Sequence, residues 1–118
     1  MKISMMQPLK SVPFLLLATL LVGAGPADAA ERESYTLTIK NNRFDPVVLR
    51  VPSDRKLKLI IRNLDPTPEE FESYSLNREK IVPGNGKITL FVGPLTPGTY
   101  KFFGDFHQDT AQGRLVAE

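Results

Sequence analysis

From residue 34 onward, turns that contain proline or glycine interrupt the chain every few residues, and no segment between them shows a sustained apolar period of 3.6. Several of these segments instead alternate apolar and polar residues. In 34–40, for example, Tyr35, Leu37 and Ile39 fall on one face, and 56–63 alternates in the same way. A period of two is typical of strands with one buried face. The pattern predicts strands at 34–40, 44–51, 56–63, 70–76, 78–82, 87–92, 98–104 and 113–117.

Seven or eight short strands in a small domain predict an all-β fold, a Greek-key β-sandwich. The segment from Glu69 to Arg78 is the one place where a short helix is an alternative, because Pro68 suits a first helical position. We favour a strand there.

The first 29 residues differ in composition from the rest and have the features of an export signal. Lys2 and Lys10 precede an apolar run from Val12 to Ala24, and Ala27-Asp28-Ala29 fits a cleavage site. The run is about 13 residues long, well below the roughly 20 that span a bilayer. We therefore expect residues 1–29 to be a signal peptide, residues 30–118 to form the domain, and the protein to be exported. The alternative is an uncleaved membrane anchor.

The chain has no cysteine, which excludes disulfides, zinc-thiolate sites, thiol nucleophiles and copper-thiolate centres. Its 15 basic and 13 acidic residues are interspersed, so no surface dedicated to nucleic acid is expected. Oxygen and nitrogen ligands are the chemistry that remains.

The stretch from Gly98 to Val116 resembles the C-terminal end of a cupredoxin. In that family a strand of the form G-x-Y-x-F-x-C leads into a loop with a histidine and then a methionine, followed by a final strand. Tyr100 and Phe102 match the strand, and His107 matches the loop histidine.

The resemblance fails at the residues that would bind copper. Gly104 stands where the cysteine is expected, and Gln112 stands near the usual place of the axial methionine, a role in which glutamine is a known substitute. Upstream, 63–71 resembles the segment N-x-D-x-x-P-H-N-F, with Glu69 in place of its histidine. A blue-copper centre is therefore not expected, because it needs a thiolate.

The resemblance still implies a metal-binding end of the sandwich, supplied here with carboxylates, one imidazole and one amide. Such hard ligands favour iron, manganese or divalent copper over monovalent copper. The candidate ligands are His107, Glu69, Glu70, Glu72, Asp105 and Gln112.

Strand parity separates the three glutamates among these candidates into two sets. On a strand, Glu70 and Glu72 share one face and Glu69 takes the other, the side of Phe71. Strand parity favours Glu69 as the ligand that points inward. The number of ligands favours the other set, because Glu70 and Glu72 together would supply two carboxylates. The alternative for all three is a solvated acidic edge or ion pairs with Arg78 and Lys80.

Details such as Thr67-Pro-Glu-Glu-Phe-Glu-Ser73 and Gly104-Asp-Phe-His107 are similar to the EfeO-type cupredoxin-like proteins that accompany bacterial iron permeases. This resemblance implies an exported, periplasmic protein that binds iron or copper and assists iron uptake, with a membrane iron permease or another periplasmic component as partner. Two alternatives stay open: a metal-free interaction module of such a complex, and an accessory ferroxidase.

Overall fold

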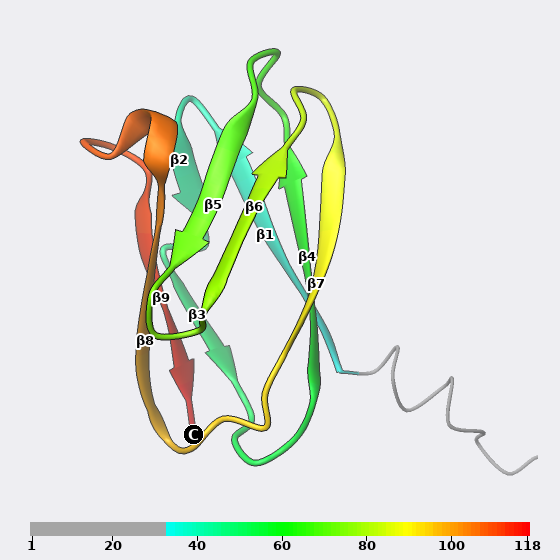
Figure 1. Cartoon of the computed structure of the whole chain (residues 1–118), viewed down its shortest axis with the longest axis vertical. Helices are drawn as coiled ribbons and strands as arrows, with labels where there is room; N and C mark the ends of the chain where they lie inside the picture. Colours follow the sequence, from blue (N-terminus) through cyan, green and yellow to red (C-terminus); the bar gives the residue numbers. More distant parts are fainter. Residues whose placement is uncertain (1–32) are drawn as a thin grey trace, which may run out of the picture.

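The computed structural model describes residues 33–118, which form two facing β-sheets (Figure 1). The strands are β1 (Ser34–Lys40), β2 (Arg43–Asp45), β3 (Val48–Val51), β4 (Leu57–Asn63), β5 (Glu69–Ser73), β6 (Arg78–Val82), β7 (Lys87–Val92), β8 (Gly98–Gly104) and β9 (Gln112–Ala117), with a 3₁₀ turn η1 (Asp105–His107) before β9. One sheet has the order β2-β1-β4-β7 and the other the order β3-β9-β8-β5-β6. The prediction of an all-β sandwich is confirmed.

The nine strands exceed the seven or eight predicted because the segment 44–51 is not one strand. Pro46 interrupts it, since proline lacks the N–H that a sheet ladder needs. β2 pairs with β1 in one sheet, whereas β3 pairs with β9 in the other. This segment therefore crosses between the two sheets, and both of its strands are edge strands.

The segment 69–78 contains no helix, as predicted, but its strand is shorter than the expected 70–76. β5 ends at Ser73, and a turn leads into β6. The Ser73 hydroxyl accepts a hydrogen bond from the amide of Leu76 at 3.2 Å and donates one to the carbonyl of Lys101 at 2.6 Å. A serine side chain that bonds backbone groups in this way replaces ladder bonds and favours a turn.

The core lies between the sheets and is built from the alternating apolar positions, including Leu37, Leu59 and Ile61, which are at most 1% exposed. Three aromatic rings join the sheets near the end that carries η1. Phe102 lies 4.9 Å from Phe44 and 5.3 Å from Phe71 between ring centroids. These three rings pack against one another beneath the loops at that end of the sandwich.

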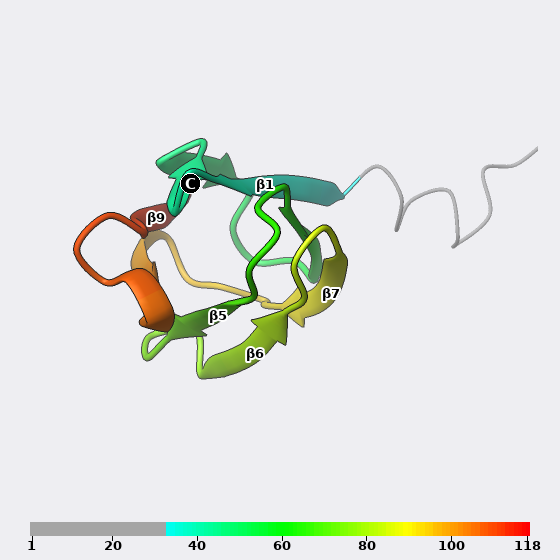
Figure 2. The ribbon, with the colours of Figure 1, turned by 90° about the horizontal axis from the view of Figure 1, so that it is seen from above.

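Those loops are tied to one another by Asp65. Its carboxylate accepts hydrogen bonds from the amides of Asn41, at 2.8 Å, and Asn42, at 2.9 Å. Its carbonyl accepts one from the amide of Asn85 at 2.8 Å. The view from above shows η1 and the loops that join β4 to β5 and β6 to β7 at the same end of the sandwich (Figure 2).

The predicted signal peptide, residues 1–29, lies outside the described residues. Among residues 33–118, no helix has the length and apolar character that crossing a membrane requires.

We predict that Phe102→Ala lowers the free energy of unfolding by about 3–5 kcal/mol, because it removes a ring that is 2% exposed and contacts both other rings. Denaturant unfolding measures the change. Phe91→Ala is the matched control, because the ring of Phe91 is 52% exposed and its substitution should cost about 1 kcal/mol or less. Equal losses in the two variants would contradict the assigned core.

Candidate functional site

Glu69 opens β5 and points into the sandwich, as strand parity predicts. The register places Phe71 of β5 opposite Gly104 of β8. Glu69, two residues before Phe71, is 1% exposed and lies beside the end of β8. A carboxylate in this position has lost its hydration and needs hydrogen bonds from the protein.

Both oxygens of this carboxylate have such partners. Its Oε2 lies 2.5 Å from Nδ1 of His107. Its Oε1 accepts the amide N–H of Phe106 at 2.9 Å and that of Glu70 at 3.0 Å. Among the described residues, no buried side-chain nitrogen or oxygen lacks a hydrogen-bond partner. The contact with His107 and Phe106 therefore holds η1 against the start of β5.

The carboxylate of Glu69 fills the space that a side chain at position 104 would need. A Cβ added to Gly104 would lie 2.6 Å from Cδ of Glu69 and 2.7 Å from Cβ of Ala111. Cβ atoms in proteins essentially never approach other heavy atoms this closely. The glycine is therefore needed because of its neighbours and not for its own backbone freedom.

The other carboxylates lie on the opposite face of β5, which faces outward. Glu70, Glu72 and Glu79 can each place one oxygen within 4.8 Å of the others. The antiparallel register of β5 and β6 brings Glu79 directly opposite Glu72. Within residues 33–118 this is the one group of three such side chains close enough to share a metal ion. We call Glu70, Glu72 and Glu79 the outer carboxylate cluster.

The members of the cluster repel one another. The hydrogen bond between Glu79 and Glu70 raises the pKa of Glu70 to about 7, with burial, Glu79, Asp105 and Glu72 also raising it. The pKa of Glu72 is raised mainly by burial and then by Glu79 and Asp105, against a hydrogen bond with Tyr74 that lowers it. Asp105 thus acts on the cluster from η1.

No lysine or arginine offsets these charges with an ion pair among the described residues. The alternative that paired the glutamates with Arg78 and Lys80 is not what the structure contains. The guanidinium of Arg78 donates to the carbonyl of Phe91 at 2.8 and 3.2 Å and to those of Leu76 and Asn77.

The structure thus divides the predicted ligands into two groups. The buried Glu69 meets the half-buried His107 at one end of the sandwich interior, whereas Glu70, Glu72 and Asp105 lie together outside it. Gln112 joins neither group, because it is exposed and its amide donates to the carbonyl of Gln108 at 2.8 Å. Glu79 is the member that sequence reasoning did not select. The sequence feature that could have identified Glu79 is the short turn between the two strands, because this turn sets the pairing of Glu72 with Glu79.

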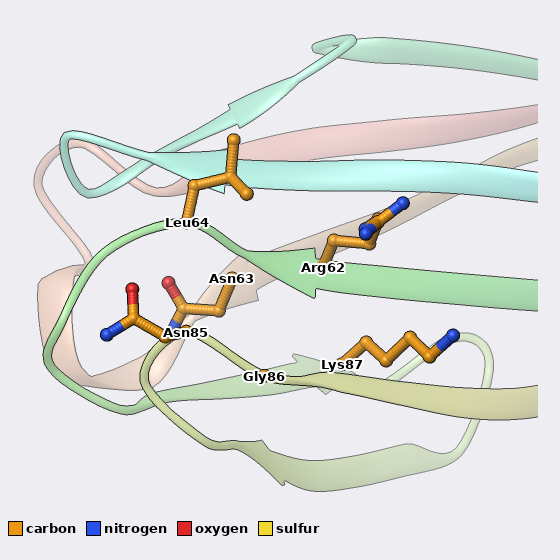
Figure 3. Close-up of a pocket in the computed structure, with 6 residues that line it drawn as sticks. All are labelled: Arg62, Asn63, Leu64, Asn85, Gly86 and Lys87. Atoms are coloured by element: carbon orange, nitrogen blue, oxygen red, sulfur yellow. The ribbon is translucent and has the colours of Figure 1, made fainter.

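A shallow pocket at the end of β4 and the start of β7 offers different chemistry (Figure 3). Its lining residues are Arg62, Asn63, Leu64, Asn85, Gly86 and Lys87, which include two cations and no carboxylate. Arg62 and Lys87 are neighbours in the β4–β7 register, and both are exposed. This pocket offers a cation neither a carboxylate nor an imidazole.

Comparison with known proteins places the whole described domain in one family. The sequence profile of the family described as "Cupredoxin-like domain" matches residues 13–117. An uncharacterized protein of Rickettsia prowazekii (strain Madrid E) is 52% identical over 80 residues, which are 68% of this chain and 64% of that protein. The chain thus matches somewhat less than two thirds of that relative's length.

Solved structures give the same fold. Auracyanin A, a blue copper protein from Chloroflexus aurantiacus, superposes with a TM-score of 0.62 at 14% identity over 72% of this chain and 98% of its own. A purple cupredoxin from Nitrosopumilus maritimus gives a TM-score of 0.55 at 16% identity over 70% and 98%.

The interior donors of this chain do not fit a blue-copper ion. Such a site uses two imidazoles and a thiolate, whereas this interior offers one imidazole and one carboxylate. An ion between Oε2 of Glu69 and Nδ1 of His107 would need about 2 Å to each atom. The 2.5 Å that separates the two atoms is too short for bonds of that length at ordinary ligand angles.

We predict that Glu70→Gln makes the protein more stable than the wild type at pH 8, with a difference that shrinks toward pH 4.5. The pKa of Glu70 in the folded protein is about 7, above its ordinary value of 4.5, so the folded state binds the extra proton between these values. The free energy of unfolding of the wild type therefore falls as pH rises through this window. Thermal unfolding between pH 4.5 and 8 measures the effect.

The control is Asp109→Asn, which removes one exposed carboxylate outside the cluster. If it reproduced the pH-dependent gain of Glu70→Gln, general charge and not the cluster would be responsible.

Proposed function

The chain belongs to the cupredoxin-like domain family, and we propose that it is an exported, periplasmic protein that binds iron through carboxylates and assists its uptake. The observation that carries this proposal is the outer carboxylate cluster, three glutamates that share one small volume on the outer face of β5 and β6. The resemblance to EfeO-type proteins supports the link to iron.

The chemistry of the cluster suits a hard cation. Carboxylate oxygens prefer iron, manganese, magnesium or calcium over soft ions such as monovalent copper. Glu79 and Asp105 both raise the pKa values of Glu70 and Glu72, so ionisation of these two carboxyls is costly without a cation. A bound divalent or trivalent ion would remove this repulsion, so folding and cation binding support each other at the cluster. Divalent copper is the second ion that this ligand set accommodates.

The position of the cluster suits transfer of the ion to a partner. Its carboxylates lie on the surface of a sheet, and Phe106 on the adjoining η1 is 48% exposed. An ion held there is open to ligands of a second protein, which we propose to be a membrane iron permease or another periplasmic iron-uptake component.

We predict that the mature protein, residues 30–118, binds one ferrous ion under anaerobic conditions and that Glu70→Gln, Glu72→Gln and Glu79→Gln each weaken binding about tenfold or more, or by about 1.4 kcal/mol. Each substitution keeps the shape of the side chain and removes one negative ligand. Calorimetric titration measures the affinity, with divalent copper as the second ion.

Asp109→Asn is the matched control, since it removes an equal charge away from the cluster. Wild-type affinity in all three glutamine variants would contradict a site at the cluster. Sustained oxidation of ferrous iron above the rate without protein would support the alternative that the protein is an accessory ferroxidase.

Export is tested separately. We predict that the protein recovered from the periplasm begins at Ala30, which intact-mass measurement detects as the loss of residues 1–29. A full-length protein held in the membrane fraction would support an uncleaved anchor instead.

The second candidate function is a metal-free interaction module of an iron-transport complex. The contact between Glu69 and His107 favours this candidate, because these two side chains bond to each other and the two atoms in contact are not free for a metal ion. Cells in which the three cluster glutamates are replaced by glutamine distinguish the two functions: normal iron uptake supports the module, and impaired uptake supports the cation site.

A further inference from the structure

By the resemblance to cupredoxins, the buried Glu69 stands in the place of a histidine that binds copper, and it packs against Gly104, which stands in the place of the copper-binding cysteine. We infer that the Glu69 side chain is a built-in occupant of the space between these ligand positions, and that the interior of this chain is closed to metal ions. The inference is independent of the outer carboxylate cluster, which lies on the other face of the same strand.

The first argument is space. The Glu69 carboxylate, Gly104 and Ala111 fit together so closely that even one added carbon at position 104 would lie 2.6 Å from Cδ of Glu69, 2.8 Å from its Oε1 and 2.7 Å from Cβ of Ala111. No side chain at 104 can be a ligand while Glu69 keeps this position. Glu69 and Gly104 are therefore a matched pair.

The second argument is that both oxygens of Glu69 and the inward nitrogen of His107 already have hydrogen-bond partners. Nδ1 of His107 is the imidazole nitrogen that faces the interior, and it is held by Oε2 of Glu69. Oε1 is held by the amides of Phe106 and Glu70. A metal ion that entered would have to take Oε2 from His107 or leave the two amides without an acceptor. Leaving a buried donor unpaired costs the desolvation of that group.

The third argument is the way this contact closes the loop after β8. The amide of Ala111 donates to the carbonyl of His107 at 2.8 Å, and the amide of Gly104 donates to the carbonyl of Ala111 at 2.8 Å. With His107 fixed to Glu69, the loop from 104 to 111 is anchored at both of its ends and at its middle. The histidine is thus a positioning residue of this loop in our account and not a metal ligand.

The direct test uses the fact that His107 is the one histidine in the chain. Nitrogen-15 NMR of the imidazole in the wild-type protein should show Nδ1 hydrogen-bonded and unchanged when zinc, a diamagnetic ion, is added to saturation. Zinc that binds elsewhere, zinc that contacts only the outward Nε2, or no binding at all each supports a closed interior. A stoichiometric change of Nδ1 to a metal-bound signal would overturn it.

The second test removes the occupant and supplies the missing ligands. Glu69→His combined with Gly104→Cys gives two imidazoles and one thiolate, the set that a blue-copper ion requires. We expect the double variant to bind divalent copper with an intense visible thiolate-to-copper absorption. Gly104→Cys alone should unfold at a lower temperature than the wild type and show no such absorption, because the Glu69 carboxylate still fills the space.

Copper absorption in Gly104→Cys alone would overturn the inference, as would a double variant that folds by circular dichroism but binds no copper. If the double variant does not fold, the zinc experiment on the wild type decides. Loss of ferrous binding in the glutamine variants of the outer cluster has no bearing on either test, so failure of the proposed function and failure of this inference are distinguishable.

Discussion

A carboxylate that is 1% exposed is stable in a β-sandwich only when hydrogen bonds replace the water it has lost, and this requirement shapes one end of the protein around Glu69. The amide of Phe106, the amide of Glu70 and the ring of His107 provide those bonds. Because two of the three come from η1, the 3₁₀ turn is fixed against β5. Because the carboxylate needs room, position 104 is a glycine.

The same strand then separates two kinds of chemistry by its period of two. Glu69 faces the core and is hydrogen-bonded by its neighbours, whereas Glu70 and Glu72 face outward and are joined by Glu79 from β6. Among residues 33–118, each buried side-chain nitrogen and oxygen has a hydrogen-bond partner. Outside, carboxylates repel one another and raise the pKa of Glu70. In our account, a cation that entered the interior would have to break hydrogen bonds of Glu69, whereas a cation at the outer carboxylate cluster would relieve repulsion between carboxylates.

Much of this arrangement follows from local sequence. The alternation of Leu57, Leu59 and Ile61 predicts a half-buried strand, and the spacing of Glu69 from Phe71 predicts that Glu69 faces inward. What local patterns do not contain is pairing across the fold. Glu69 meets His107 over 38 residues of sequence, and Glu79 meets Glu72 only because the turn after Ser73 sets that register. Local patterns do not predict the division of 44–51 at Pro46 for the same reason, since the partners of β2 and β3 lie in different sheets.

The most direct test of the account is where a metal ion lies when crystals of residues 30–118 are soaked anaerobically with ferrous iron and measured at the iron absorption edge. The account predicts an anomalous peak among the carboxylates of Glu70, Glu72 and Glu79 and none between Glu69 and His107. A peak bonded to Nδ1 of His107, with the Glu69 carboxylate displaced, would contradict it.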